Sequence, residues 1–235
     1  DIRTPMNAII GFTNIALHQD SVPEMHNCLK KIEESSDHLL SLLNDVLDLS
    51  RIESGKVEFS PVPANITAVT DSVIEIVKGM LLNRELNFEV HREPLQNPYV
   101  MTEPVRIREI LVNILNNAVK FTKDGGTIRF DAGNRPGADA QHIVICYRIK
   151  DTGIGMSEEV CAHLFEQHRR EEPESITADG SVKRGCGLAL FNVLQRIHFF
   201  YGEDSGMRVK SQEGMGTQVI VELNGEPHEP APLTV

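Results

Sequence analysis

The sequence predicts an α+β protein in two parts, a long helical hairpin followed by an α/β sandwich. Two observations predict this fold class. Apart from Ser36, apolar residues recur at alternating steps of three and four from Leu29 to Val46, which is typical of a long amphipathic helix. Beyond Pro61 and Pro63, strand and helix candidates interleave without regular βαβ repetition. The expected boundaries are residues 1–56 for the hairpin, 57–223 for the sandwich and 224–235 for a disordered tail.

Two amphipathic segments define the hairpin. Between residues 2 and 16, mostly apolar residues are spaced three or four positions apart, which predicts a first helix. A second helix is expected from about residue 24 to 51, and Gly55 is expected to end it. A turn at residues 20–23 separates them. Because one pair of amphipathic helices cannot bury a broad apolar stripe alone, two hairpins are expected to pack as a four-helix bundle, making the chain a homodimer.

The elements of the second part follow from local periodicity. A helix over residues 105–120 has apolar residues on one face, and the segment 143–150 alternates apolar and polar residues as a strand does. The remaining expected elements are strands at 86–90, 127–131, 208–210 and 218–223 and a helix at 188–197.

Composition excludes several classes of function. The formal net charge is −11 and no Trp is present, which argues against nucleic-acid binding because that needs clustered cations or stacking aromatics. The four cysteines show no C-x-x-C spacing, so neither a zinc site nor a disulfide framework is expected and a reducing compartment fits. No run approaches the roughly 20 apolar residues that span a bilayer. The abrupt polar start without Met suggests a fragment of a longer protein.

The first chemical motif lies on the 105–120 helix. Asn113 and Asn117 are four residues apart and share a face, and Lys120 lies about one turn further along. Two amides and an ammonium on one face can hold a hydrated Mg²⁺ with its triphosphate. An ordinary solvated helix face is the alternative interpretation.

The second motif directly follows an expected strand. Asp151 at a strand end is a good acceptor for an amino group, and Gly153 and Gly155 let the backbone approach a flat ligand. The same D-x-G-x-G pattern also occurs in plain turns.

The third motif places Gly185 and Gly187 directly before a helix, where backbone N–H groups attract phosphate. The polar stretch 168–184 before it has no periodicity and is interpreted as a lid over a nucleotide, with Lys183 and Arg184 near the phosphates. A surface insertion is the alternative. A fourth motif, residues 214–217, is explained equally well as a tight hairpin.

The order of these motifs resembles the sensor histidine kinases of two-component systems, within the ATPase superfamily shared with gyrase and Hsp90-type proteins. Residues 1–5 resemble the end of the H-box, and residues 113–122 resemble the N-box. Residues 151–155, 185–190 and 214–217 resemble the three glycine motifs. The resemblance runs from residue 1 to about residue 223.

The resemblance implies roles for single residues. Asn117 would coordinate Mg²⁺ with support from Asn113, and Asp151 would accept a hydrogen bond from the adenine amino group. The other residues implied to contact ATP or shape its site are Lys120, Phe121, Gly153, Gly155, Lys183, Arg184, Gly185, Gly187 and Thr217. The implied cofactors are ATP and Mg²⁺.

The resemblance also implies a reaction and a partner. Phosphate would pass to a histidine immediately upstream of Asp1, with Asp1 as general base, and then to an aspartate of a response-regulator receiver domain. Thr4 would position water for dephosphorylating that partner. Since no histidine precedes the R-T-P run, the chain as it stands is expected to bind ATP without autophosphorylating. A cytoplasmic location is expected, with membrane attachment only through segments that the sequence does not include.

Two alternatives stay open at this stage. A catalytically impaired dimeric scaffold, or pseudokinase, is favoured by Cys186 and Ala189, which stand where the family commonly has Thr and Gly. An ATP-hydrolysing relative of the gyrase or Hsp90 kind is disfavoured because Asn113 stands where those enzymes place a glutamate base.

Overall fold

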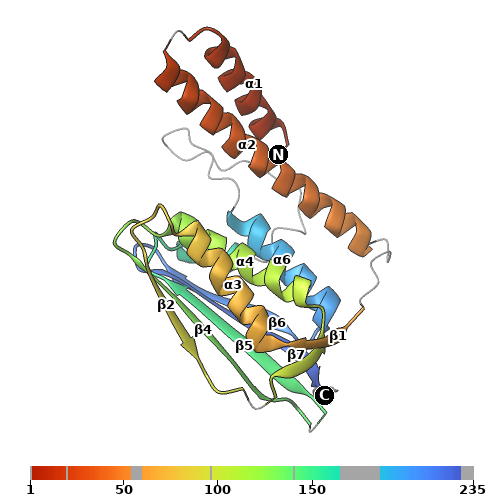
Figure 1. Ribbon diagram of the computed structural model, residues 1–235. Coiled ribbons are helices and arrows are strands. Elements are labelled where there is room, and N and C mark those ends of the chain that lie inside the picture. Colours follow the sequence, from red (N-terminus) through yellow and green to blue (C-terminus); the bar gives the residue numbers. More distant parts are fainter. Residues whose placement is uncertain are drawn as a thin grey trace, which may run out of the picture. The chain divides into compact units, whose positions relative to one another are not determined.

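The computed structural model describes residues 2–19, 21–53, 60–95, 97–139, 141–164 and 186–228. The chain divides into two compact units, residues 1–58 and 59–235, and this division lies close to the predicted boundary after residue 56. The first unit is helical and the second is a sheet covered by helices (Figure 1). The predicted α+β class is therefore confirmed.

The first unit is a hairpin of α1 (Arg3–Leu17) and α2 (Val22–Glu53), which pack along each other. The expected second helix is confirmed and extends two residues further at each end. Several large apolar side chains of the hairpin stay exposed within the unit, including Ile10 at 53%, Leu29 at 54% and Leu40 at 58%. These side chains are thus about half exposed within their own hairpin.

The second unit is built on a seven-stranded sheet in the order β1-β3-β7-β5-β4-β2, with β6 paired to β7. Only β2 and β4 run parallel among the strand pairs described. The strands are β1 (Val62–Asn65), β2 (Asn87–Arg92), β3 (Tyr99–Thr102), β4 (Thr127–Pro136), β5 (Ile143–Asp151), β6 (Gly206–Gln212) and β7 (Gly216–Pro227). The central neighbours β5 and β7 are antiparallel, so the end of β5 lies beside the start of β7.

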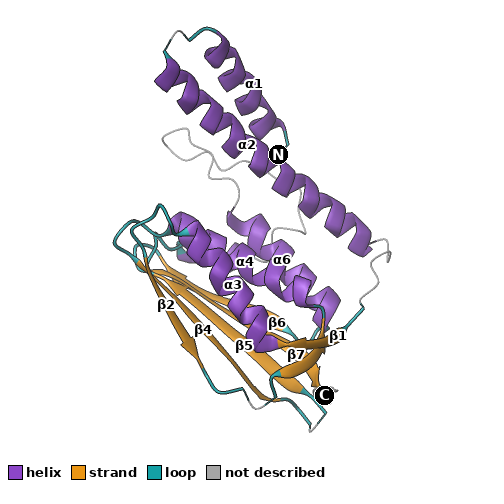
Figure 2. Cartoon of the chain, viewed as in Figure 1, coloured by secondary structure: helices purple, strands orange, loops and turns teal. Residues whose placement is uncertain are grey.

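Helices α3 (Ile66–Met80), α4 (Pro104–Phe121) and α6 (Cys186–Tyr201) lie on one face of this sheet (Figure 2). A short helix, α5 (Glu158–His163), follows β5. Helix α4 has Pro104 in its first turn and confirms the predicted 105–120 helix. Helix α3 was not predicted. Asn65 caps it by accepting a hydrogen bond from the Ala68 backbone N–H at 3.2 Å.

The core lies between the helices and the sheet face that they cover. On β5 the side chains of Ile145, Tyr147 and Ile149 are buried there, whereas those of Arg148 and Lys150 are exposed on the other face. The predicted alternation of this strand is therefore confirmed. Burying such a large apolar side chain stabilises the fold by about 1.5–3 kcal/mol.

The C-terminal strand corrects one prediction. A disordered tail was expected from residue 224, but β7 continues to Pro227, with Asn224 opposite Val144 and Pro227 opposite Val100. His228 N–H then donates to the Tyr99 carbonyl at 2.9 Å. The prediction is wrong for this stretch because β5 and β3 offer backbone partners that outweigh the turn-like composition. Residues 229–235 lie outside the described residues.

In the part of the chain that the structure describes, no helix is both long and apolar enough to cross a membrane.

Candidate functional site

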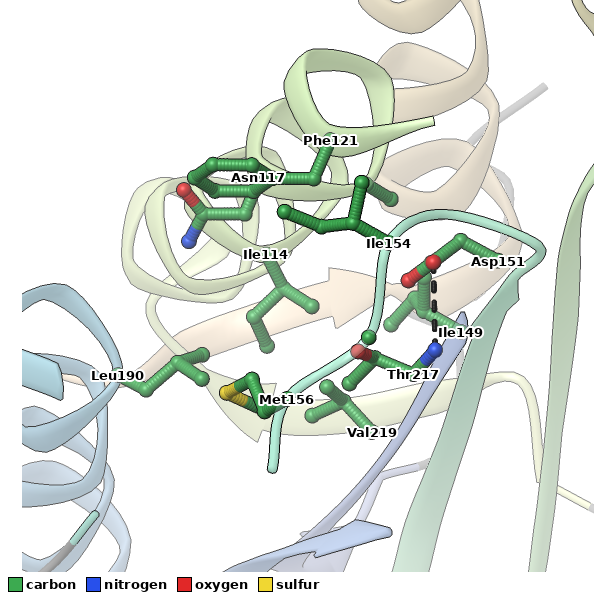
Figure 3. A pocket seen from close by; sticks show the side chains of 12 residues that line it. Ile114, Asn117, Phe121, Ile149, Asp151, Ile154, Met156, Leu190, Thr217 and Val219 are labelled. Atoms are coloured by element: carbon green, nitrogen blue, oxygen red, sulfur yellow. Dashed lines mark hydrogen bonds between the residues drawn. The ribbon is translucent and has the colours of Figure 1, made fainter. Parts of the chain in front are cut away.

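A pocket opens between α4, the ends of β5 and β7, and the loop that follows β5 (Figure 3). Its lining is mostly apolar, with three polar side chains. The lining residues are Ile114, Asn117, Ala118, Phe121, Ile149, Asp151, Ile154, Gly155, Met156, Leu190, Thr217 and Val219. An apolar cavity with few polar groups is the usual form of a small-molecule site.

Helix and strand periodicity bring these residues together. Ile114, Asn117, Ala118 and Phe121 follow the i, i+3, i+4, i+7 stepping of one helix face. Strands contribute every second residue, so Asp151 follows Ile149 into the pocket from β5, and β7 contributes Thr217 and Val219 in the same way.

Asp151 is the charged group of the lining. Its side chain is buried, and its Oδ1 accepts hydrogen bonds from the backbone N–H of Gly153 at 2.8 Å and of Thr217 at 3.2 Å. Figure 3 shows the second of these bonds, and the other carboxylate oxygen faces the pocket. Burial raises the pKa of Asp151, and the two backbone donors oppose that rise. The pocket therefore presents one strong acceptor within apolar surroundings.

Glycines allow the loop after β5 to touch the β6–β7 hairpin. Gly155 has φ +65°, and a Cβ at this position would collide with the backbone carbonyl of Gln212. Gly216 has φ +95°, and a Cβ there would collide with the Asp151 carbonyl. Both positions demand glycine for conformation and for space.

Hydrogen bonds hold that loop against its neighbours. Ile154 N–H donates to the Phe121 carbonyl at 3.2 Å, and Gly214 N–H donates to the Ile154 carbonyl at 2.7 Å. Met156 N–H donates to Ser211 Oγ at 2.8 Å. The loop wall is thus tied to the end of α4 on one side and to the hairpin on the other.

The structure brings together five of the residues singled out in the sequence, which all line the pocket: Asn117, Phe121, Asp151, Gly155 and Thr217. Gly153 lies next to them, because its backbone N–H binds the Asp151 carboxylate.

The other two candidates on α4 lie outside the lining. Asn113 is partly exposed one turn before Asn117. Lys120 is exposed, with its Nζ 5.4 Å from the centroid of the Phe121 ring. Both remain on the helix that forms the pocket wall.

The remaining candidates are distributed elsewhere. Thr4 is exposed in the first turn of α1, in the hairpin unit. Gly187 lies in the first turn of α6. Four candidates lie outside the described residues: Asp1, Lys183, Arg184 and Gly185.

The described residues hold no group of three or more His, Cys, Asp or Glu side chains that could bind a metal ion. On α4, Asn117 lines the pocket with a carboxamide, and Asn113 carries another carboxamide one turn earlier. A hard cation there would need further oxygen ligands from water or from a bound anion.

Sequence reasoning missed the apolar walls of the pocket. Ile114 and Ala118 could have been found from the same helical stepping that selected Asn117. Ile149 lies two residues before Asp151, and Val219 lies two residues after Thr217. Strand alternation places each of them on the same face as its neighbour in the pocket. Leu190 joins the pocket through tertiary packing of α6, for which the sequence carries no local signal.

The chain matches two known protein families. Residues 102–227 match the family described as Histidine kinase-, DNA gyrase B-, and HSP90-like ATPase. Residues 1–55 match the family described as His Kinase A (phospho-acceptor) domain. The two matches fall on the sandwich and on the hairpin.

Among curated proteins, the chain is similar to the Autoinducer 2 sensor kinase/phosphatase LuxQ of Vibrio parahaemolyticus serotype O3:K6. The two are 31% identical over 223 residues, which is 95% of this chain and 25% of LuxQ. The chain thus spans about a quarter of the length of that relative.

Two solved structures share the fold. Histidine kinase ThkA in complex with response regulator protein TrrA superposes with a TM-score of 0.65 at 18% identity, covering 97% of this chain and 60% of that one. Full-length ShkA in complex with AMPPNP gives a TM-score of 0.63 at 24% identity, covering 98% and 45%.

Proposed function

Since the chain belongs to the sensor histidine kinases of two-component systems and carries their phosphoacceptor and ATP-binding domains, we propose that it performs their reaction. In that reaction the α/β unit binds ATP with Mg²⁺ and transfers phosphate to a histidine. The phosphate is then relayed to an aspartate of a response-regulator receiver domain.

The observation that carries the proposal is the single free acceptor of Asp151. Its Oδ1 already accepts two backbone N–H groups, so one oxygen is left to accept a hydrogen bond from a ligand. An adenine amino group donates one such bond, and the ring would contact apolar side chains such as Met156 and Val219.

The phosphate end of the site is assigned to α4. Asn117 would hold Mg²⁺ through its carboxamide oxygen, with Asn113 supporting it and Lys120 facing the phosphates. An amide donor suits an ion that keeps several waters and phosphate oxygens. ATP bound with Mg²⁺ supplies the transferable γ-phosphoryl group, so the contribution of the chain is positioning and charge neutralisation.

The helical hairpin is assigned the partner contacts. Its exposed Ile10, Leu29 and Leu40 fit burial against a second copy in a four-helix bundle. Thr4 is exposed and accessible to a receiver domain. The response regulator bound to ThkA supports a partner of that class. Asp1 remains the predicted general base, and Lys183, Arg184 and Gly185 remain predicted phosphate and lid residues.

Two measurements test the proposal. Calorimetry with Mg·ATP should show binding that Asn117→Ala weakens, whereas Asn134→Ala should bind as the unaltered chain does. Asn134 is a matched control because its amide donates to the Asn97 carbonyl at 2.9 Å on β4, away from the pocket lining.

Transfer is tested with a histidine placed directly before Asp1 and γ-labelled ATP. An acid-labile, base-stable label that depends on this histidine is expected. Binding without any label would refute transfer and favour a nucleotide-binding scaffold. Absence of binding would refute the nucleotide site itself.

A further inference from the structure

Ser211 does not line the pocket but contacts Thr217, which does. It is the second-last residue of β6 and pairs directly with Thr217 of β7, so the two side chains share a sheet face. Met207 and Val209 precede it on that face, and an apolar residue would continue their stripe. A hydroxyl at this position therefore has a local cost unless it forms bonds.

The Ser211 hydroxyl contacts three groups. Met156 N–H donates to Oγ at 2.8 Å, the Gly216 carbonyl lies 3.0 Å from Oγ, and Thr217 Oγ1 lies 2.8 Å away. A serine hydroxyl has one proton to donate and two lone pairs to accept with. All three contacts can be hydrogen bonds in one arrangement only.

That arrangement is set by counting protons. The Met156 N–H must donate to Ser211 Oγ, and the Gly216 carbonyl can only accept, so it takes the single Ser211 proton. Thr217 must then donate its own proton to the remaining lone pair of Ser211. The lone pairs of Thr217 Oγ1 are left for the pocket, which Thr217 lines (Figure 3).

We propose that Ser211 is a positioning residue that turns the Thr217 proton away from the pocket, so that the pocket presents two acceptors, Thr217 Oγ1 and the free Asp151 oxygen. This inference rests on the proposed ATP site. A base with an amino group at its 6-position can donate hydrogen bonds to these two acceptors. A base with an oxo group at that position is itself an acceptor there and forms no hydrogen bond with them. Ser211 thus contributes to the preference for the amino form without touching the nucleotide.

The test is the ratio of the dissociation constants of ATP and inosine triphosphate (ITP), which carries the 6-oxo group. In Ser211→Ala the Thr217 proton is free to turn and donate to the oxo group. The preference for ATP should therefore fall by roughly three- to tenfold, the worth of one hydrogen bond. Ser211→Thr keeps the hydroxyl, so this variant should retain the preference for ATP that Ser211→Ala loses.

A double-mutant cycle separates positioning from general loosening. Thr217→Val has no hydroxyl proton to redirect, so adding Ser211→Ala to it should leave the ATP to ITP ratio unchanged.

Ser205→Ala is the matched control. Ser205 is buried, its hydroxyl makes two backbone hydrogen bonds, and it lies just before the other end of β6. Its replacement should not change the ratio. If Ser211→Ala does not fold, Ser211→Cys fills the space with a weak donor and gives the same comparison.

The outcomes are distinguishable. An unchanged ratio in Ser211→Ala, or a shift that persists in the Thr217→Val background, would overturn the inference and leave the ATP site intact. Failure of the unaltered chain to bind either nucleotide would overturn the proposed function, and the inference with it.

Discussion

Asp151→Asn should separate nucleotide binding from folding. The Asn carbonyl oxygen can take over both backbone hydrogen bonds of the carboxylate, from Gly153 at 2.8 Å and Thr217 at 3.2 Å. The opposite orientation would set the amide NH₂ against two N–H donors, so the side chain keeps its oxygen toward the backbone. The NH₂ group then occupies the position of the free carboxylate oxygen and faces the pocket.

The loss of affinity has two parts. A hydrogen bond to a charged acceptor contributes about 1.5–3 kcal/mol, and two donors that face each other leave at least one unpaired, which costs more. Together they weaken ATP binding by about 2–4 kcal/mol, or roughly 30- to 1,000-fold. Stability should change by less than about 1 kcal/mol, because both backbone bonds persist and a buried charge is removed.

The assay is calorimetric titration with Mg·ATP beside urea denaturation. Asp131→Asn is the matched control, since Asp131 is 8% exposed against 7% for Asp151 but pairs with Arg129 at 2.7 Å and does not line the pocket. It should bind ATP normally and lose stability instead. Tight ATP binding by Asp151→Asn would refute the assignment of the acceptor, and unfolding of this variant would refute the argument from its backbone bonds.

The pKa of Asp151 adds a dependence on pH. Burial raises this pKa, so the folded chain takes up the proton at a higher pH than the unfolded chain does. The contribution of this group to stability therefore falls as pH rises through the window from the ordinary aspartate pKa to the raised one. ATP affinity should follow the opposite course, because the deprotonated form is the acceptor. Asp151→Asn should remove both dependences, as denaturation and titration across the acidic range would show.

Three further predictions concern the frame of the pocket. Gly155→Ala should lower the free energy of unfolding by about 2 kcal/mol or more, because it combines a φ of +65° with a backbone collision at Gln212. Gly79→Ala, in α3 with open space around its Cβ, should be neutral or stabilising, and equal urea midpoints for the two variants would contradict the argument. Burial raises the pKa of Tyr147 to about 12, so folded Tyr147 keeps its proton where the unfolded chain loses it, and stability should fall as pH rises between about 10 and 12. Tyr147→Phe should flatten that part of the alkaline denaturation profile, and an unchanged slope would count against it. Arg84→Ala should lower stability by about 1–3 kcal/mol, because the guanidinium donates to the Val119 and Thr122 carbonyls at 3.2 and 2.7 Å at the end of α4. Arg84→Lys should recover only part of this loss in the same denaturation assay, since one ammonium does not reproduce the planar fork.

The elements with strong periodicity were predictable. Burial on one side explains the spacing of apolar residues in α2, the apolar face of α4 and the alternation of β5. Each of these elements was predicted as the correct type, helix or strand, with approximately correct bounds. Asp151 and its glycines were found because an aspartate at a strand end followed by G-x-G fits a ligand site, and because the order of the four motifs supported this interpretation. Helix α3 was missed although the Asn65 cap and the buried Val69, Val73 and Val77 carry the same kind of signal.

Other features depend on tertiary structure. The strands β1 and β3 have four residues each, too few for a period to emerge. They pair with each other, and β3 also pairs with the end of β7. Leu190 reaches the pocket only because α6 packs on the sheet. Ser211 looks like an ordinary polar strand residue until its three partners, one from the loop after β5 and two from the start of β7, are in place.

The antiparallel pairing of β5 and β7 places Thr217, near the start of β7, beside Asp151, the last residue of β5, although the two are 66 positions apart in the chain. A hydrogen bond from the Thr217 backbone N–H to the Asp151 carboxylate joins these two points, so the segment between them, which includes β6, is a chain loop closed at its base. Closing a loop costs free energy that grows only with the logarithm of its length, by about 0.6 kcal/mol for each doubling. Insertions and deletions between α5 and α6 should therefore be tolerated without moving the acceptor pair. Because Asp151 and Thr217 are far apart in the sequence, their contact is a non-local one. The formation of the pocket should therefore be among the slower events of folding.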